Sequence, residues 1–365
     1  MIHSGMFAGT LLAVILASRS PIEMDTNYIS NYCTSLGEQQ VESIWNGVKE
    51  NIEDNYADVY DFSNYEVKMS EEISGNGNRV VSIDVAVDMT LEKKPEESPI
   101  IMGMRLASEE YSSIYEKQKA EEIIDKYIEE FSSYYEVPIR TGFLYQAVVS
   151  PSVNTKSVDI QVELFYKSEL DDGEIILAPI NFESVIDKTG NEDYSALLRE
   201  EIGKDAIIRS ARTASYDRFN AVSYAVTHAT DQPEFSGNGN SDCANFVSKC
   251  VNAGGIPTDT NGNWYPASTW GDISTGGVNW YRTGYYGNGG VIPYLTGKGY
   301  FNSVSESGVI TGCIMSYNNK SHVAFVTACD GYTIKYSHHS SSAKPYIYYT
   351  YNSSTDDVTF YKCSQ

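Results

Sequence analysis

The stretch Ser241-Asp242-Cys243-Ala244-Asn245-Phe246-Val247 (SDCANFV) decides how the C-terminal part of the chain is interpreted. It follows the helix breaker at positions 237–240 (GNGN), and Ser241 or Asp242 can cap a helix by accepting a bond from its free N–H groups. Apolar residues then recur at helical spacing until Gly254-Gly255 and Pro257. The sequence therefore predicts a helix that runs to Ala253, with Cys243 in its first turn.

Cys243 has the residue type and the position of a nucleophile. The helix dipole and the free N–H groups of a first turn favour a thiolate, and the same N–H groups can hold an oxyanion. We expect the backbone of Asp242, Cys243 and Ala244 to supply these donors. Asn245, which faces away from the apolar stripe, is expected to brace the loop. The competing interpretation of Cys243 is a small hydrophobe at the start of a buried face.

A histidine later in the chain favours the catalytic interpretation. Two apolar runs, Val309 to Ser316 and His322 to Ala328, are separated by a polar turn, as in a pair of strands. His322 opens the second run, so its ring can point from a strand end toward the start of a helix. A Cys–His pair needs this proximity, because the imidazole must reach the sulfur. We predict that His322 is the base.

The partner of His322 depends on a count through the next turn. Asp330-Gly331 is a strong signal for a two-residue hairpin turn, which sets His339 opposite His322. His339 is therefore the preferred third group, which fixes the tautomer of the base. A turn of three residues would put His338 in that place, and this alternative stays open.

Residues 22–205 have the pattern of a separate α+β domain. A predicted helix at Val41 to Asn55 precedes an alternating strand at Val80 to Thr90, and the same order recurs with a helix over 114–135 and a strand over 158–166. This recurrence is compatible with an internal duplication. A further strand at 174–180 follows the turn Asp171-Asp172-Gly173, as in a hairpin. No catalytic residue types cluster in this domain.

Composition changes near residue 205, where acidic residues become sparse and Gly, Asn, Ser and Tyr become frequent. A chain of 365 residues suggests two domains, and we place them at 22–205 and 206–365. The net charge of −23 argues against nucleic acid, anionic lipid or anionic wall polymers as partners. No spacing of Cys and His residues is typical of a zinc site, and we expect neither a metal nor a cofactor.

The first residues and the cysteines are informative about whether the protein is exported from the cell. Residues 1–21 contain the apolar run Met6 to Ala17, which suits the core of a secretory signal and is too short to cross a bilayer. A buried helix is the alternative. Six cysteines would suit an exported protein, but Cys243 and Cys250 lie two turns apart on one helix face and cannot bridge. We expect few disulfides or none.

Three segments together resemble a known family. They are YDRFNAVSYA (216–225), DCANFVSKCVNAGGIP (242–257), and SHVAFVT (321–327) with the later YSHHS (336–340). This combination is similar to the putative bacterial amidase domain family, which is related to the NlpC and CHAP cysteine hydrolases. The resemblance covers about the last 150 residues of the chain. It implies a papain-like fold in which a helix carrying Cys243 packs against an antiparallel sheet carrying His322, with His339 as the polar third member.

The resemblance implies a secreted or cell-surface bacterial hydrolase that cleaves amide bonds in cell-wall peptide. Its substrate would be a peptide or a peptidoglycan-type amide, and no membrane contact beyond the leader is expected. Two alternatives remain. The site could transfer the acyl group to an amine, as a transpeptidase or transglutaminase-like enzyme does, or the domain could be a wall- or glycan-binding module without activity.

Overall fold

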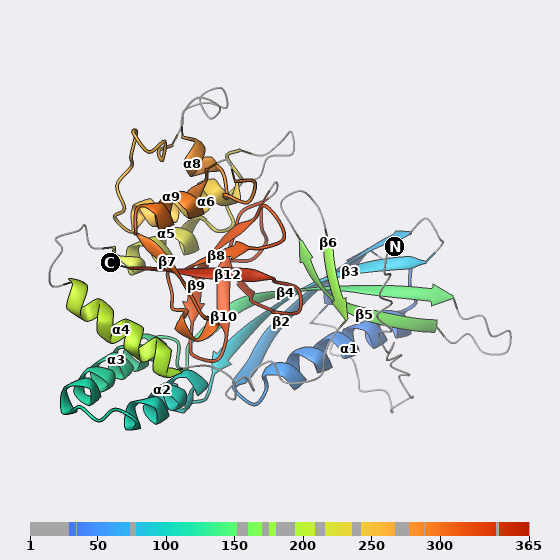
Figure 1. The fold of residues 1–365 in the computed structure, drawn as a ribbon. Coiled ribbons are helices and arrows are strands. Elements are labelled where there is room, and N and C mark those ends of the chain that lie inside the picture. The colour runs from blue at the N-terminus through green and yellow to red at the C-terminus, as the bar shows by residue number, and fades with distance from the viewer. Residues whose placement is uncertain are drawn as a thin grey trace, which may run out of the picture.

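The computed structural model of the protein describes residues 29–33, 35–73, 78–151, 160–169, 175–179, 194–208, 216–235, 242–266, 277–287, 289–340 and 343–364. Within these ranges the chain is α+β, as predicted, and one largely antiparallel sheet joins its strands (Figure 1). The order along the sheet is β1-β2-β3-β4-β11-β10-β9-β8-β12-β7, and β5 and β6 extend from β4. The predicted leader lies outside the described residues.

The N-terminal strands form a layer that helix α1 (Glu38–Tyr56) covers on one face (Figure 1). Val41, Ile44, Val48 and Ile52 recur at helical spacing along α1, and all are buried against the strands. The strands of this layer are β1 (Ile29–Cys33), β2 (Tyr60–Ile73), β3 (Arg79–Leu91), β4 (Pro138–Pro151), β5 (Ile160–Glu169) and β6 (Ile175–Pro179).

The order helix, strand, strand occurs twice in the described residues, as α1-β2-β3 and as α3 (Ile114–Ser132)-β4-β5. The two helices begin at Glu38 and Ile114, and the strands that follow them begin at Tyr60 and Pro138, so both pairs differ by nearly the same offset. The predicted recurrence of elements is therefore present, while its origin in a duplication stays a prediction. The expected turn between β5 and β6 lies outside the described residues.

The C-terminal strands lie between two layers of helices. One layer consists of α2 (Pro99–Glu109), α3 and α4 (Tyr194–Ile208), and a short 3-10 helix, Pro95–Glu97, leads into it. The other layer consists of α5 (Arg218–His228), α6 (Cys243–Ala253), α8 (Val278–Tyr281) and α9 (Val291–Gly297). The strands between them are β7 (Phe301–Val304), β8 (Ile314–Tyr317), β9 (Val323–Cys329), β10 (Ile334–Ser337), β11 (Tyr348–Thr350) and β12 (Val358–Cys363), with a 3-10 turn at Glu306–Gly308.

Strand β4 connects the N-terminal strands to the C-terminal ones. Its residues Thr141 and Gly142 pair in parallel with Tyr348 and Tyr349 of β11. A side chain at Gly142 would collide with the ring of Tyr346, because a Cβ there would stand 2.3 Å from a ring carbon. Helices α2 to α4 precede residue 208 in sequence and cover the C-terminal strands, so the two parts of the chain share one buried cluster. The domain boundary near residue 205 stays a prediction.

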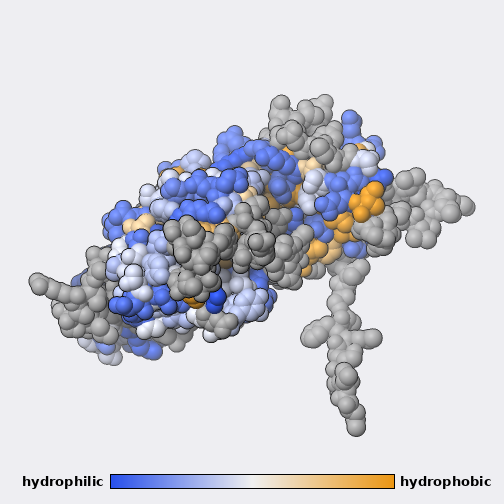
Figure 2. Space-filling view, turned by 90° about the horizontal axis from the view of Figure 1, so that it is seen from above, coloured by the Kyte–Doolittle hydropathy of each residue, from blue (hydrophilic) through white to orange (hydrophobic). Residues whose placement is uncertain are grey.

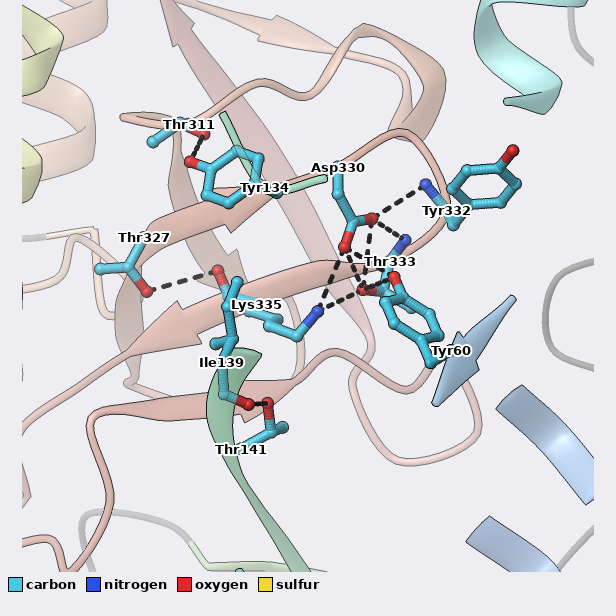
Figure 3. Close-up of polar contacts among 10 residues, drawn as sticks. All are labelled: Tyr60, Tyr134, Ile139, Thr141, Thr311, Thr327, Asp330, Tyr332, Thr333 and Lys335. Carbon is cyan, nitrogen blue, oxygen red and sulfur yellow. Dashed lines mark hydrogen bonds and ion pairs between the residues drawn. The ribbon is translucent and has the colours of Figure 1, made fainter. Parts of the chain in front are cut away.

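A buried polar cluster joins β2 to the turn between β9 and β10 (Figure 3). Tyr60 Oη donates to Asp330 Oδ2 at 2.6 Å, and Lys335 Nζ lies 3.3 Å from the same oxygen and 2.8 Å from Thr333 Oγ1. The side chains of Lys335 and Asp330 are only 1% and 2% exposed. Charges this deeply buried need such partners, because desolvation of an unpaired charge is very unfavourable. We call Tyr60, Asp330, Thr333 and Lys335 the turn cluster.

Figure 2 shows mainly hydrophilic residues on this face of the molecule, with hydrophobic residues gathered toward the N-terminal strands. No helix within the described ranges is long and apolar enough to cross a membrane.

Candidate active site

Helix α6 starts at Cys243 and ends at Ala253, as its sequence predicts. The Cys243 side chain is buried, with 1% of its surface exposed. It belongs to the same buried cluster as Val323 and Phe325 of β9, so the first turn of α6 packs on the face of the sheet that these strand residues form.

Asp242 occupies the N-cap position of α6, but its side chain accepts no bond from the helix backbone, contrary to the predicted cap. Its Oδ1 accepts from Asn245 Nδ2 at 2.7 Å, and its Oδ2 accepts from the Glu234 backbone at 3.2 Å and lies 2.9 Å from His339 Nδ1. Both carboxylate oxygens of Asp242 are therefore engaged by groups outside the helix backbone. Asn245 braces this segment further, since its Oδ1 accepts from Trp280 Nε1 at 2.9 Å.

His322 stands one residue before β9, and its bonded neighbour is His338. The distance between His322 Nε2 and His338 Nδ1 is 3.0 Å, and the two rings meet edge to face. Both side chains are buried, at 1% and 5% exposed. A bond between two imidazoles needs one donor and one acceptor, so the pair holds one shared proton along this line.

His339 has other partners than the one predicted for it. Its Nδ1 faces the Asp242 carboxylate at 2.9 Å, and its Nε2 donates to the backbone oxygen of His228 at 2.8 Å. Its ring stacks on Phe246 of α6 at 4.3 Å between centroids. Both ring nitrogens of His339 are therefore engaged by acceptor groups. His339 thus ties the end of α5 to the start of α6.

The predicted two-residue turn at Asp330-Gly331 is wrong. Cys329 pairs with Ile334, so the connection has four residues, and the register shifts once more between Lys335 and Tyr336. The cause lies in the Asp330 carboxylate, which accepts the backbone N–H groups of Tyr332 at 3.1 Å and Thr333 at 2.8 Å and so lengthens the turn. The register alone does not select a partner for His322, because Ser337 pairs with Phe325 and the ladder leads past His338 and His339. The preferred partner His339 is corrected by the direct contact of His338 with His322.

The two histidine contacts lie on opposite sides of β10, as the alternation of side chains along a strand requires. His322 and His338 contact Tyr317 and Tyr336, which belong to the cluster under α2 to α4. His339 contacts α6 on the other side. All three histidines nevertheless lie at one end of the β9–β10 pair. Because His339 also binds Asp242, the first turn of α6 lies at this end as well.

Burial governs the charge of this region. Desolvation lowers the pKa of His338 well below 6.5, and the nearby charges of Lys344 and His322 lower it further. Behind His322, the ring of Tyr317 lies 5.0 Å away, and its Oη donates to buried Asp356 at 3.0 Å. Burial raises the pKa of Asp356. Neither Tyr317 nor Asp356 stands in a motif, so sequence reasoning does not find them.

Three of the other cysteines are poor nucleophiles. Burial raises the pKa of Cys250 and Cys329 well above the usual 9.0 and that of Cys313 to about 11. These three thiols are free.

Two tryptophans and one further histidine of the C-terminal part have structural roles. Trp264 and Trp280 are fully buried, so they fill the core and line no groove, and Trp270 lies outside the described residues. The ring of His228 pairs with Asp231 at 2.7 Å on the surface. In the described ranges no three His, Cys, Asp or Glu side chains converge in a way that could hold a metal ion.

Comparison with known proteins bears on the same part of the chain. Residues 215–362 match the family model described as a putative amidase domain, which confirms the resemblance seen in the sequence. The match supports a hydrolase that acts on amides. No curated protein and no solved structure matches the chain.

Proposed function

We propose that the chain is a cysteine amidohydrolase or peptidase, with Cys243 as nucleophile, His322 as base and His338 as the group that orients the base. The observation that carries this proposal is the bond of 3.0 Å between His322 Nε2 and His338 Nδ1, at the end of the sheet where α6 begins with Cys243. His339 cannot replace His322, because its two ring nitrogens are already bonded to Asp242 and to the backbone of His228.

His322 directly precedes the first residue of β9, so it stands at the end of the sheet. In this proposal its ring extends beyond that end and reaches the sulfur of Cys243. Its Nε2 is bound by His338, so Nδ1 is the nitrogen that takes the thiol proton. The proton makes His322 an imidazolium, whose Nε2–H then donates to His338. Because burial keeps the pKa of His338 low, the proton stays on His322 and is available for the leaving group.

The chemistry is a transfer of an acyl group in two steps. The Cys243 thiolate adds to the amide carbonyl carbon, and the backbone N–H groups around residues 242–244 hold the oxyanion. As the C–N bond breaks, His322 gives its proton to the nitrogen, which leaves as an amine, and a thioester remains on Cys243. Water, deprotonated by His322, then attacks the thioester, and the acid and the free thiol are released. No cofactor takes part in these steps.

His339 and Asp242 have a positioning part in this scheme. Their bond fixes the residue directly before Cys243, and the stacking of His339 on Phe246 fixes the first turn of the helix. When His339 carries a proton, its positive charge lies beside the first turn of α6 and favours a thiolate there.

We infer further that the substrate is a cell-wall peptide and that the chain acts outside the cytoplasm. The support is the resemblance in the sequence together with the apolar run over residues 6–17. Asn245 and Ala244 belong to the support of the oxyanion site and form no part of substrate recognition in this proposal.

The test combines a digest and a labelling experiment on the full chain. Peptidoglycan fragments incubated with the protein should gain one new amine and one new carboxylate, detected by mass spectrometry. Cys243→Ala should abolish this product, whereas the matched control Cys363→Ser should keep it. Iodoacetamide near neutral pH should label Cys243 first, because burial raises the pKa of Cys250, Cys313 and Cys329. Product formation by Cys243→Ala would refute the proposal, and an isopeptide in place of the free acid would make the enzyme a transferase.

A further inference from the structure

An exposed pair of tyrosines stands beside the segment that leads into His322. Tyr285 and Tyr286 are 45% and 76% exposed. Their rings meet edge to face at 77°, with centroids 5.0 Å apart, and so form an open corner of two aromatic faces. Most aromatic side chains of the C-terminal part are buried or half-buried in the described ranges, so this exposure is unusual in the molecule.

Two hydrogen bonds fix the corner to residues 319–321. Tyr285 Oη donates to the backbone oxygen of Asn319 at 3.0 Å, and Thr283 Oγ1 lies 3.0 Å from Ser321 Oγ. The backbone N–H of Tyr285 also donates to Thr283 Oγ1 at 3.2 Å. Since Ser321 directly precedes His322, the corner lies beside the proposed base.

The backbone on either side of the corner is constrained at the residues that the structure describes. Gly284 and Gly290 have φ values of 106° and 143°, which other residues rarely adopt. Their backbones touch, because a Cβ on Gly290 would stand 2.3 Å from the nitrogen of Gly284. Val291 N donates to Arg282 O at 2.8 Å and closes the loop. The backbone thus holds two large rings toward water, although exposed apolar surface is unfavourable. A bound ligand would remove that cost.

We propose that Tyr285 and Tyr286 bind an uncharged sugar ring that flanks the amide to be cleaved. This inference rests on the proposed function. A sugar has one flat face of C–H groups, which suits an aromatic ring, and polar edges, which can stay in water on an open corner. An aromatic side chain of a peptide would favour a deeper pocket, where both of its faces are covered. The net charge of −23 disfavours an anionic sugar.

The test measures binding of a neutral oligomer of N-acetylglucosamine to the full chain carrying Cys243→Ala, by calorimetry and ligand-observed NMR. Tyr286→Ala should weaken binding by about fivefold or more, because one aromatic face is lost. Tyr286→Phe should bind nearly as the parent does. Tyr285→Phe should bind more weakly than the parent, because the ring loses its bond to Asn319. The matched control is Tyr115→Ala, since Tyr115 is 61% exposed on α3 and should leave binding unchanged.

Two outcomes would overturn the sugar site: no binding of the oligomer to the parent at millimolar concentration, or equal binding to Tyr286→Ala. Binding of an aromatic amide in place of the oligomer would also overturn it. The assay needs no turnover. A chain that binds the oligomer through Tyr286 but cleaves no amide would therefore refute the hydrolase and keep the sugar site.

Discussion

The two ends of the β9–β10 hairpin both carry buried polar groups, but these groups are bonded in different ways. At the turn, Asp330 accepts from two backbone N–H groups, from Tyr60 and from Lys335 (Figure 3). At the open end, the bond between His322 and His338 joins two groups that can each give or take a proton. The hairpin thus has a fixed, charged end and an end whose protonation can change.

This difference separates stability from chemistry. Tyr60 of β2 donates to Asp330, which also meets the buried Lys335 ammonium, so the turn cluster locks the hairpin to the N-terminal strand β2. A neutral imidazole beside a second imidazole can pass a proton without moving. Substitutions at the turn should therefore change the free energy of unfolding, and substitutions at the open end should change the rate of turnover.

His322→Ala tests the open end most severely. It removes the proposed base and the acid for the leaving amine, and turnover of an amide substrate should fall by roughly a thousandfold or more. The free energy of unfolding, measured with urea, should change much less than for a substitution in the turn cluster. A variant with nearly full turnover would show that His322 takes no part in the reaction.

Asp330→Ala tests the turn. It leaves the Lys335 ammonium buried beside Tyr60 without its counter-charge, and should lower the free energy of unfolding by about 3–5 kcal/mol. Folded protein should keep most of its turnover per molecule. A matched double variant, Asp330→Leu with Lys335→Met, removes both charges and should recover much of the lost stability. Equal stability of the parent and the single variant would mean that the cluster does not lock the hairpin.

The sequence predicts local features of this hairpin better than its register. Helix α6 and strands β8 and β9 follow from apolar spacing and from the glycines at 254–255, which act over a few residues. The partner of His322 could not be counted, because the carboxylate of Asp330 lengthens the turn and one further shift follows at Lys335. The pairing of β4 with β11 joins residues about 200 positions apart, and no local pattern encodes such a contact.

His338→Ala and His339→Ala should separate two functions of neighbouring residues. His338→Ala removes the group that orients the base, and turnover should fall on the order of a hundredfold with little loss of stability. His339→Ala leaves the buried Asp242 side chain without its imidazole partner, so stability should fall as well as turnover. The measurements are kcat and urea unfolding of each variant. Suppose that His339→Ala lowered turnover without lowering stability, and that His338→Ala lowered neither. The pairing of His322 with His338 would then have no catalytic importance.

The smallest expected effect is a dependence of stability on pH at the open end. Burial lowers the pKa of folded His338 well below 6.5, whereas the unfolded residue binds a proton near pH 6.5. Between these two values the unfolded chain holds more protons than the folded one, so the free energy of unfolding should decrease as the pH falls below about 6.5.

One such proton changes the free energy of unfolding by at most about 1.4 kcal/mol per pH unit, and other groups titrate in the same pH range. Buried Asp356 acts with the opposite sign, because its raised pKa makes the folded chain take up a proton more readily. The useful quantity is therefore the difference in the free energy of unfolding between the parent and His338→Asn at each pH. The contribution of Asp356 cancels in this difference. Asparagine does not titrate and can still bond His322. Urea unfolding from pH 8 to pH 5 should show that the parent loses stability faster than the variant below pH 6.5. If the difference in the free energy of unfolding between parent and variant stays constant over this range, burial does not hold His338 neutral. The proposal that the proton stays on His322 would then lose its support.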